Sequence, residues 1–128
     1  MKALLDTHTF LWWNLDAPQL SDTAREFITD GQNEIFLSAA TAWEIAIKYA
    51  RKRLALPETP DRYIANRMTQ HNFSPLPILL SHATKVFALP AIHTDPFDRL
   101  LVSQSQLEGL PLLTVDSEIA RYDVDIIW

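Results

Sequence analysis

The chain has 128 residues, of which 48% are apolar and 21% are charged, and its formal net charge is −5. These proportions are typical of a soluble globular protein, and the length suits a single domain, residues 1–128, with its own core. The absence of cysteine excludes a disulfide framework, a thiolate zinc site and a cysteine nucleophile. The negative charge argues against a protein that holds nucleic acid through bulk positive charge, but a nuclease site built from acids remains compatible with it.

No apolar run approaches the roughly 18–20 residues that a membrane span requires. The first apolar residues are followed at once by Asp6, so we expect neither a secretory leader nor an association with a membrane. With the absence of cysteine, this favours a cytoplasmic location. Two glycines in the chain are too few for a glycine-rich phosphate loop.

The first half of the chain predicts two strands, each followed by helical sequence. The strands are Lys2–Leu5 and Glu34–Ser38. The helices are expected at Thr9–Leu15, at Asp22–Asp30 between an N-cap at Ser21 and a stop at Gly31, and at Ala39–Arg53. In the last of these helices the apolar residues recur at helical spacing, which predicts a buried face formed by Trp43, Ala46, Ile47 and Ala50.

The second half continues the alternation. Thr59 and Pro60 predict the start of a helix that runs to His71, and Asp95-Pro96 predicts the start of another that runs to Glu108 before Gly109. Between them, Phe73–Leu79 contains two prolines and predicts an edge strand or an extended loop. The remaining predictions are a short helix at Ser81–Leu89, a strand at Pro111–Val115, a helical turn at Ser117–Tyr122 and a last strand at Asp125–Trp128.

Alternating strands and helices predict an α/β protein with a central, mostly parallel sheet covered by helices on both faces. In such sheets ligands bind beyond the carboxyl ends of the strands. Asp6 and Asp116 each follow a predicted strand, and Glu44 and Asp98 lie early in helices that leave the same edge. The order of elements therefore gathers four carboxylates on one rim.

Each acid also has a structural interpretation. Glu44 can complete a capping box with Thr41 or pair with Lys48, but it lies too deep to cap if the helix starts at Ser38 or Ala39. Asp95 is the natural N-cap before Pro96, and Asp98 in the first turn suits the helix dipole.

Four acids on one rim repel one another unless a cation neutralises them. Hard divalent ions with oxygen ligands do so, and they can activate water and stabilise the charge that develops on a phosphodiester. No histidine is needed as a base: His8 is better explained as a helix-start residue, and His71, His82 and His93 lack zinc-ligand spacing.

Four segments together resemble the PIN-domain ribonucleases, specifically the VapC-type toxins of toxin–antitoxin pairs. They are Leu4-Leu5-Asp6-Thr7-His8, Ser38-Ala39-Ala40-Thr41-Ala42-Trp43-Glu44-Ile45-Ala46, His93-Thr94-Asp95-Pro96-Phe97-Asp98-Arg99-Leu100-Leu101-Val102 and Leu113-Thr114-Val115-Asp116. The resemblance covers the whole chain and implies a PIN-like three-layer α/β/α fold.

The resemblance also implies an endoribonuclease that depends on Mg²⁺ or Mn²⁺, a homodimer, and inhibition by a small cognate antitoxin. It assigns catalysis and metal binding to Asp6, Glu44, Asp98 and Asp116, with Asp95 as a ligand, a cap or both. Thr7 and Thr114 match polar positions that flank the acids. The alternative is a non-catalytic PIN-like module that binds RNA or protein, against which the retention of all four acids argues.

One basic cluster stands out in this acidic chain, formed by Lys48, Arg51, Lys52 and Arg53. It is either a solvated helix end, stabilised by the helix dipole, or a rim that contacts RNA phosphates. Arg99, directly after Asp98, could contact substrate or balance charge. For Trp12 and Trp13, adjacent on one helix, core packing and a partner contact both remain open; Trp43 and Trp128 are expected in the core.

Overall fold

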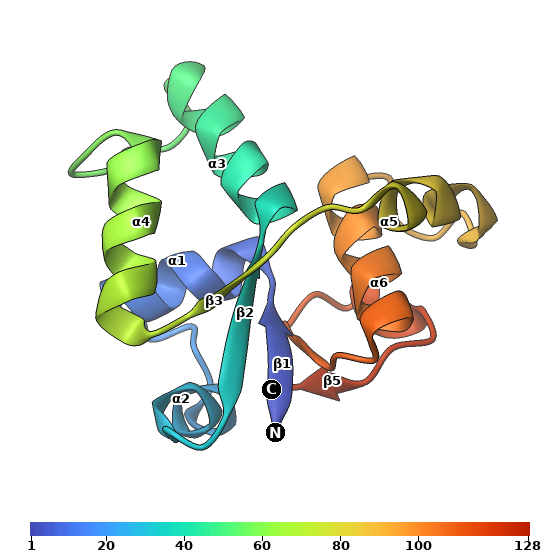
Figure 1. Ribbon diagram of the computed structural model, residues 1–128, viewed down its shortest axis with the longest axis horizontal. Coiled ribbons are helices and arrows are strands. Elements are labelled where there is room, and N and C mark those ends of the chain that lie inside the picture. The colour runs from blue at the N-terminus through green and yellow to red at the C-terminus, as the bar shows by residue number, and fades with distance from the viewer.

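Strand β1 (Lys2–Leu5) lies at the centre of a sheet in the computed structural model, which describes residues 1–128 (Figure 1). The other strands are β2 (Glu34–Ser38), β3 (Ser74–Leu76), β4 (Leu112–Leu113) and β5 (Ile126–Ile127). Their order in the sheet is β3-β2-β1-β4-β5, and every neighbouring pair is parallel. All five strands therefore end at the same edge, as the alternation of elements predicted.

The helices connect these strands and cover both faces of the sheet, which confirms the three-layer architecture. They are α1 (Thr7–Leu15), α2 (Asp22–Thr29), α3 (Ala39–Ala50), α4 (Pro60–His71), α5 (Leu80–Lys85) and α6 (Pro96–Glu108), with short 3₁₀ turns η1 (Val86–Ala88) and η2 (Ile119–Arg121). In Figure 1, α1, α2 and α4 lie to one side of β1, and α5 and α6 lie to the other. None of these helices is both long enough and apolar enough to cross a bilayer.

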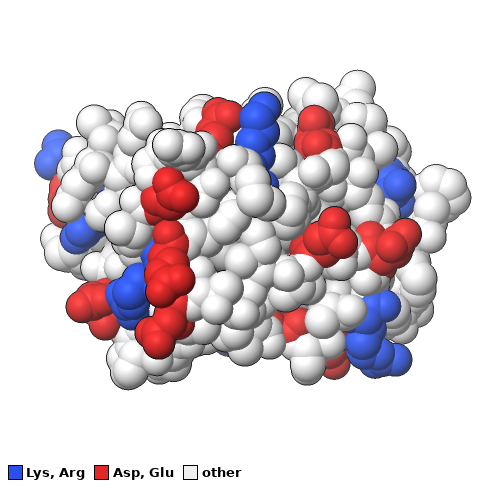
Figure 2. Space-filling view, turned by 90° about the horizontal axis from the view of Figure 1, so that it is seen from below, with Lys and Arg blue, Asp and Glu red and all other residues white.

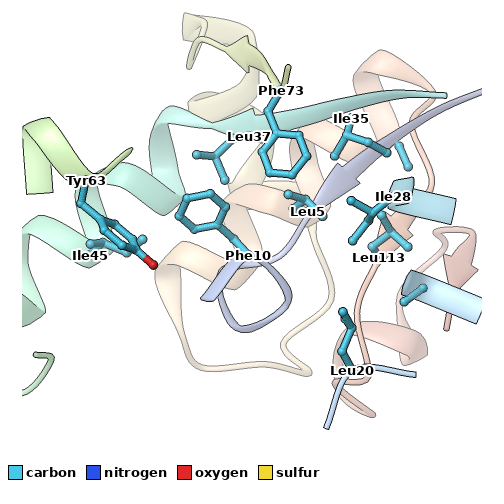
Figure 3. Packing of buried hydrophobic residues seen from close by; sticks show 12 residues of the cluster. Leu5, Phe10, Leu20, Ile28, Ile35, Leu37, Ile45, Tyr63, Phe73 and Leu113 are labelled. Atoms are coloured by element: carbon cyan, nitrogen blue, oxygen red, sulfur yellow. The ribbon is translucent and has the colours of Figure 1, made fainter. Parts of the chain in front are cut away.

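Alternate residues of the strands divide the core into two clusters, because successive side chains of a strand point to opposite faces. Ala3 and Leu5 of β1 pack with Phe10, Tyr63 and Phe73 in the first cluster, where the Phe10 ring lies between the two other aromatic rings (Figure 3). In the second cluster, Leu4 packs against residues of α6 and η2, including Leu100, Leu101, Val102 and Ile119. Both clusters press on β1 and fix the strand that leads to Asp6.

A buried polar network joins the start of α3 to α6 on one side of the sheet. The Ser38 hydroxyl donates to Gln104 Oε1 and also caps α3 by accepting from the backbone N–H of Ala40. The Gln104 amide donates to the carbonyl of Pro77 at 3.2 Å and lies 3.3 Å from Nδ1 of His82, which is 1% exposed. Because these groups are buried, each depends on its partners, and the network fixes α3 relative to α6.

The sequence misjudged which face of α3 is buried. The predicted apolar face is largely exposed: Trp43, Ala46 and Ala50 face solvent, while Thr41, Glu44 and Ile45 are buried. Periodicity detects which residues share a face but not whether another element covers that face. Trp43, expected in the core, is 56% exposed. Trp12 and Trp13 are both half-buried against the first cluster, as is Trp128.

Several predicted boundaries shift in the structure. Helix α1 begins two residues earlier than predicted because Asp6 is its N-cap, and α3 ends at Ala50 instead of Arg53. Gly31 does not end α2, since the cap is Asp30 in an extended conformation. The Asp95 cap and the left-handed Gly109 at the end of α6 are confirmed. Strand β4 has two residues where five were predicted, so Asp116 follows it after a short loop.

Replacing Gln104 by alanine should destabilise the fold, because Ser38 and the Pro77 carbonyl would lose their buried partner. We expect a loss of about 2–3 kcal/mol in the free energy of unfolding, measured by urea denaturation. Gln106→Ala on the same helix is the matched control, since its amide donates only to the exposed carbonyl of Asp123. Equal stability of the two variants would contradict the network's role.

Candidate active site

Asp6 lies where β1 ends, and its buried carboxylate is held by hydrogen bonds on both oxygens. The backbone N–H of Thr9 donates to Oδ1 at 2.7 Å, which caps α1, and the Thr114 hydroxyl donates to Oδ2. The residue is only 4% exposed. Burial raises the pKa of Asp6 above its ordinary value, although these hydrogen bonds act in the opposite direction. Thr114 is thus a positioning partner of Asp6, as its sequence position suggested.

Glu44 lies in the second turn of α3 and faces inward. The Thr7 hydroxyl donates to its Oε1 at 2.6 Å, and the Lys48 ammonium group lies 2.7 Å from its Oε2. Because Ser38 is the N-cap of α3, Glu44 is too deep in the helix to form the capping box that its spacing allowed. The Glu44 carboxylate is 4% exposed and has no capping role, which makes it a candidate for the chemistry of the site.

Asp98 lies in the first turn of α6, beneath the cap formed by Asp95. The Asp95 carboxylate accepts from the backbone N–H groups of Phe97 and Asp98 at 2.8 and 3.1 Å. Burial, reinforced by the negative charges of Asp95, Glu44 and Asp6, raises the pKa of Asp98 to about 7, against an opposing effect of His93. This shift shows that acids from β1, α3 and α6 share one electrostatic environment.

Asp116 reaches the same site from the loop after β4. Its Oδ1 accepts from the backbone N–H groups of Glu118 and Ile119, which starts the turn η2. Burial would raise the pKa of Asp116, but the hydrogen bond from His93 and these two N–H groups outweigh burial and lower it. Asp116 therefore stays ionised beside a neighbour, Asp98, that is partly protonated at neutral pH.

His93 links the last two acids and was not predicted as a site residue. Its Nε2 lies 3.0 Å from Asp98 Oδ2 and 3.1 Å from Asp116 Oδ2, while its Nδ1 accepts from the backbone N–H of Asp95. This arrangement places the ring proton on Nε2, facing the carboxylates. Burial would lower the pKa of His93, but Asp116 and Asp98 raise it. The sequence signal for His93 was its position two residues before Asp95. A search for zinc-ligand spacing does not find such a residue.

Arg99 organises the segment that carries His93. Its two terminal nitrogens donate to the backbone carbonyls of Val86, Leu89, Pro90 and His93 and to the Tyr122 hydroxyl. Tyr122 in turn accepts from the backbone N–H of His93 at 2.8 Å. These hydrogen bonds give Arg99 a structural role, and the substrate contact that its sequence position suggested stays a prediction.

The basic cluster divides between two places. The Lys48 ammonium group is bound to Glu44 at the site. Arg51, Lys52 and Arg53 are exposed just beyond the C-terminal end of α3, roughly 10 Å along the helix from Glu44 at a rise of about 1.5 Å per residue. Acids outside the site are dispersed; Figure 2 shows several separate groups of them on the side where the chain begins.

The acidic cluster, which we define as Asp6, Glu44, Asp98 and Asp116, has the donor chemistry of a site for a hard divalent cation. Ligand atoms of His93, Asp98 and Asp116 lie within 4.8 Å of one another. Asp6 and Glu44 lie outside this tight group and are connected to it through their effect on the pKa of Asp98. A bound cation would stabilise the ionised form of Asp98, which burial and the neighbouring acids disfavour, so the residues present fit such an ion.

The fold and this site define a class of protein: a doubly wound parallel domain with acids at the carboxyl edge of its sheet. The chain belongs to the PIN-domain family, since the family description "PIN domain" matches residues 3–125. The resemblance noted from the sequence is thereby confirmed at the level of the family.

Known proteins similar to this chain include Ribonuclease VapC16 from Mycobacterium tuberculosis (strain ATCC 25618 / H37Rv). The identity is 41% over 68 residues, which are 53% of this chain and 48% of the relative, so the chain matches about half of that protein's length.

Two solved structures share the fold. VapBC2 from Rickettsia felis, bound to a DNA fragment from its promoter, aligns with a TM-score of 0.70 at 14% identity, over 98% of this chain and 97% of the other. FitAcB from Neisseria gonorrhoeae aligns with a TM-score of 0.64 at 20% identity, over 98% and 96%.

Replacing Asp98 by asparagine should stabilise the metal-free protein in a pH-dependent way. The folded protein keeps a proton on Asp98 up to about pH 7, whereas the unfolded chain loses it near 3.8. Wild-type stability therefore falls, relative to the variant, as the pH rises from about 4 to 7. In EDTA we expect the free energy of unfolding of the variant to exceed that of the wild type by about 2–3 kcal/mol at about pH 8. At about pH 5 the difference should be less than half as large.

Thermal unfolding at several pH values measures this gain. Asp123→Asn, at an exposed acid outside the acidic cluster, controls for the loss of one negative charge. An Asp98→Asn variant that is no more stable than wild type at the higher pH would refute the electrostatic description of the site.

Proposed function

We propose that the protein is an endoribonuclease that depends on Mg²⁺ or Mn²⁺ and acts as the toxin of a toxin–antitoxin pair. The observation that carries the proposal is geometric: ligand atoms of His93, Asp98 and Asp116 lie within 4.8 Å of one another, at the edge of the sheet where the carboxylates of Asp6 and Glu44 are buried. Carboxylate oxygens gathered in this way suit a hard divalent cation. The similarity to a protein named as a ribonuclease supports RNA as the substrate.

In the proposed enzyme, Asp6, Asp98 and Asp116 would hold the ion, Glu44 would bind it directly or through water, and Asp95 caps the helix α6 that carries Asp98. When bound, such an ion activates water and stabilises the negative charge that develops on a phosphodiester. The chain's own contribution is preorganisation. Thr114 fixes the orientation of Asp6, and Thr7 fixes that of Glu44, so that the oxygens need little rearrangement when the ion arrives.

Lys48 and His93 balance charge in the proposed site. Lys48 pairs with Glu44, and the Nε2–H of His93 faces Asp98 and Asp116. Both donors lower the repulsion among the acids. We assign them to positioning the carboxylates and do not require either as a base.

We further propose a small antitoxin protein and a second copy of the chain as partners. Support comes from the fold shared with VapBC2 and FitAcB and from the likeness to VapC-type toxins in the four segments quoted above. The alternative, a PIN-like module that binds RNA or protein without catalysis, has less support because the acids and the threonines that orient them are all in place.

Purified protein should cleave single-stranded RNA in a mixed pool when Mg²⁺ or Mn²⁺ is added, and EDTA should abolish the cleavage. Asp6→Asn and Asp98→Asn should each reduce the rate by about a hundredfold or more, because each removes an oxygen ligand. Gel analysis of the products measures this, with Asp123→Asn as the matched control. Cleavage that survives both chelation and these substitutions would exclude the metal-dependent mechanism.

We propose that Lys52 and Arg53 contact RNA phosphates beyond the acidic cluster. The double variant Lys52→Gln, Arg53→Gln should bind RNA more weakly. The slope of log affinity against log salt concentration should also become less steep by about one to two. Fluorescence anisotropy with a labelled oligonucleotide at several salt concentrations measures both. Lys85→Gln, on α5, is the control, and an unchanged slope would assign the pair to a solvated helix end.

A further inference from the structure

We propose that Trp43, supported by Phe97, is a stacking platform for the base of a nucleotide next to the scissile phosphate. The inference deepens the proposed ribonuclease function and rests on it. It explains an observation that the fold leaves unexplained: the α3 tryptophan is 56% exposed, although the protein has apolar clusters on both faces of its sheet that could have buried it.

The two aromatic residues flank two members of the acidic cluster. Trp43 immediately precedes Glu44 on α3, and Phe97 immediately precedes Asp98 on α6. The two rings meet across the space between these helices, with centroids 5.0 Å apart and planes at 82°. Figure 1 shows α3 and α6 side by side at the end of the sheet where β2 leads into α3. In the proposed complex, an RNA strand bound at the acids would have a neighbouring base within reach of this pair, because each ring is one residue from an acid of the cluster even though it points in a different direction.

The geometry holds the tryptophan ring and leaves a surface for stacking. In an edge-to-face pair one ring directs its edge at one face of the other ring, so at least one face of the indole is not covered by Phe97. The neighbours one turn away on the exposed side of α3 are Ala39 and Ala46, which are too short to screen that face. The ring is thus oriented, accessible and flat.

Such a surface suits an RNA base better than a protein side chain. Single-stranded RNA offers unstacked bases that bind aromatic side chains, and this contact tolerates any sequence because every base has a π-face. A chain of net charge −5 cannot rely on general attraction to phosphates, whereas stacking needs no positive charge. Lys48, bound to Glu44, is the nearest cation on the same helix and would face the backbone of the same strand.

The test combines three variants with two substrates. Trp43→Ala, Trp43→Phe and Phe87→Ala are compared on an RNA oligonucleotide that the wild type cleaves and on the same oligonucleotide with abasic nucleotides flanking the cleaved bond. Phe87 is the matched control, because it is a 90% exposed aromatic residue on η1. Binding of both oligonucleotides is also measured in EDTA by quenching of tryptophan fluorescence, a readout that does not require cleavage.

We expect Trp43→Ala to lower kcat/KM on the intact RNA by about tenfold to a hundredfold, and Trp43→Phe to retain most of the activity. Removing the flanking bases should impair the wild type by a similar factor and should hardly affect Trp43→Ala. That non-additivity separates stacking from a folding defect, which would lower cleavage of both substrates equally.

If the wild type cleaves RNA, and Trp43→Ala cleaves it as fast as the Phe87→Ala control, the stacking platform is overturned and the ribonuclease proposal stays intact. The platform also fails if Trp43→Ala cleaves normally but changes the mass of the protein in light scattering, which would make Trp43 a contact between protein chains. A wild type that cleaves no RNA would instead overturn the proposed function itself.

Discussion

The burial of neighbouring carboxylates is the constraint on which the site depends. Asp98 is buried near the charges of Asp95, Glu44 and Asp6, and its pKa rises to about 7. Burial contributes most to this shift, since it removes water that would otherwise solvate the charge. The protein tolerates the arrangement because the threonine hydroxyls, His93 and Lys48 each donate to one or two of these oxygens. The fold thus maintains a site that is electrostatically strained without a cation.

Holding this strain requires rigid surroundings. Strand β1 is fixed by apolar clusters on both faces, so Asp6 cannot retreat from the other acids. The Ser38–Gln104 hydrogen bond ties the start of α3 to α6, the two helices that carry Glu44 and Asp98. Arg99 fixes the segment before α6 through its backbone carbonyls. These contacts limit how far the elements that carry the acids can move apart.

Much of this could be predicted from the sequence because parallel α/β topology follows from local patterns. Short apolar runs and the caps at Ser21, Asp95 and Gly109 sufficed to place the elements and to bring the acids to one edge. Which face of α3 is buried could not be predicted, because the residues of its apolar stripe and the residues of its true inner face both recur at helical spacing. The inner face includes Thr41 and Glu44, polar residues that become buried only because partners from α1 and α3 satisfy them.

His93 and Arg99 escaped prediction for a related reason. His93 acquires its role from two carboxylates, of which Asp116 is 23 residues away, and no local spacing encodes that approach. Arg99 lies beside Asp98 in sequence, which suggested a role in substrate binding. Its guanidinium group donates to four backbone carbonyls of the segment between α5 and α6. Adjacent residues on a helix point in different directions, so neighbours in sequence need not act on the same ligand.

In the proposed function, an acidic protein acts on a polyanion and must replace bulk attraction with local contacts. The net charge of −5 opposes the approach of RNA, and the acidic cluster adds to that barrier, which a bound divalent ion would lower. Contacts to phosphates are weakened by salt because they depend on the release of counterions, whereas stacking on an aromatic ring releases none. The proposed stacking on Trp43 would therefore supply binding energy close to carboxylates at which further lysines or arginines would compete with a metal ion.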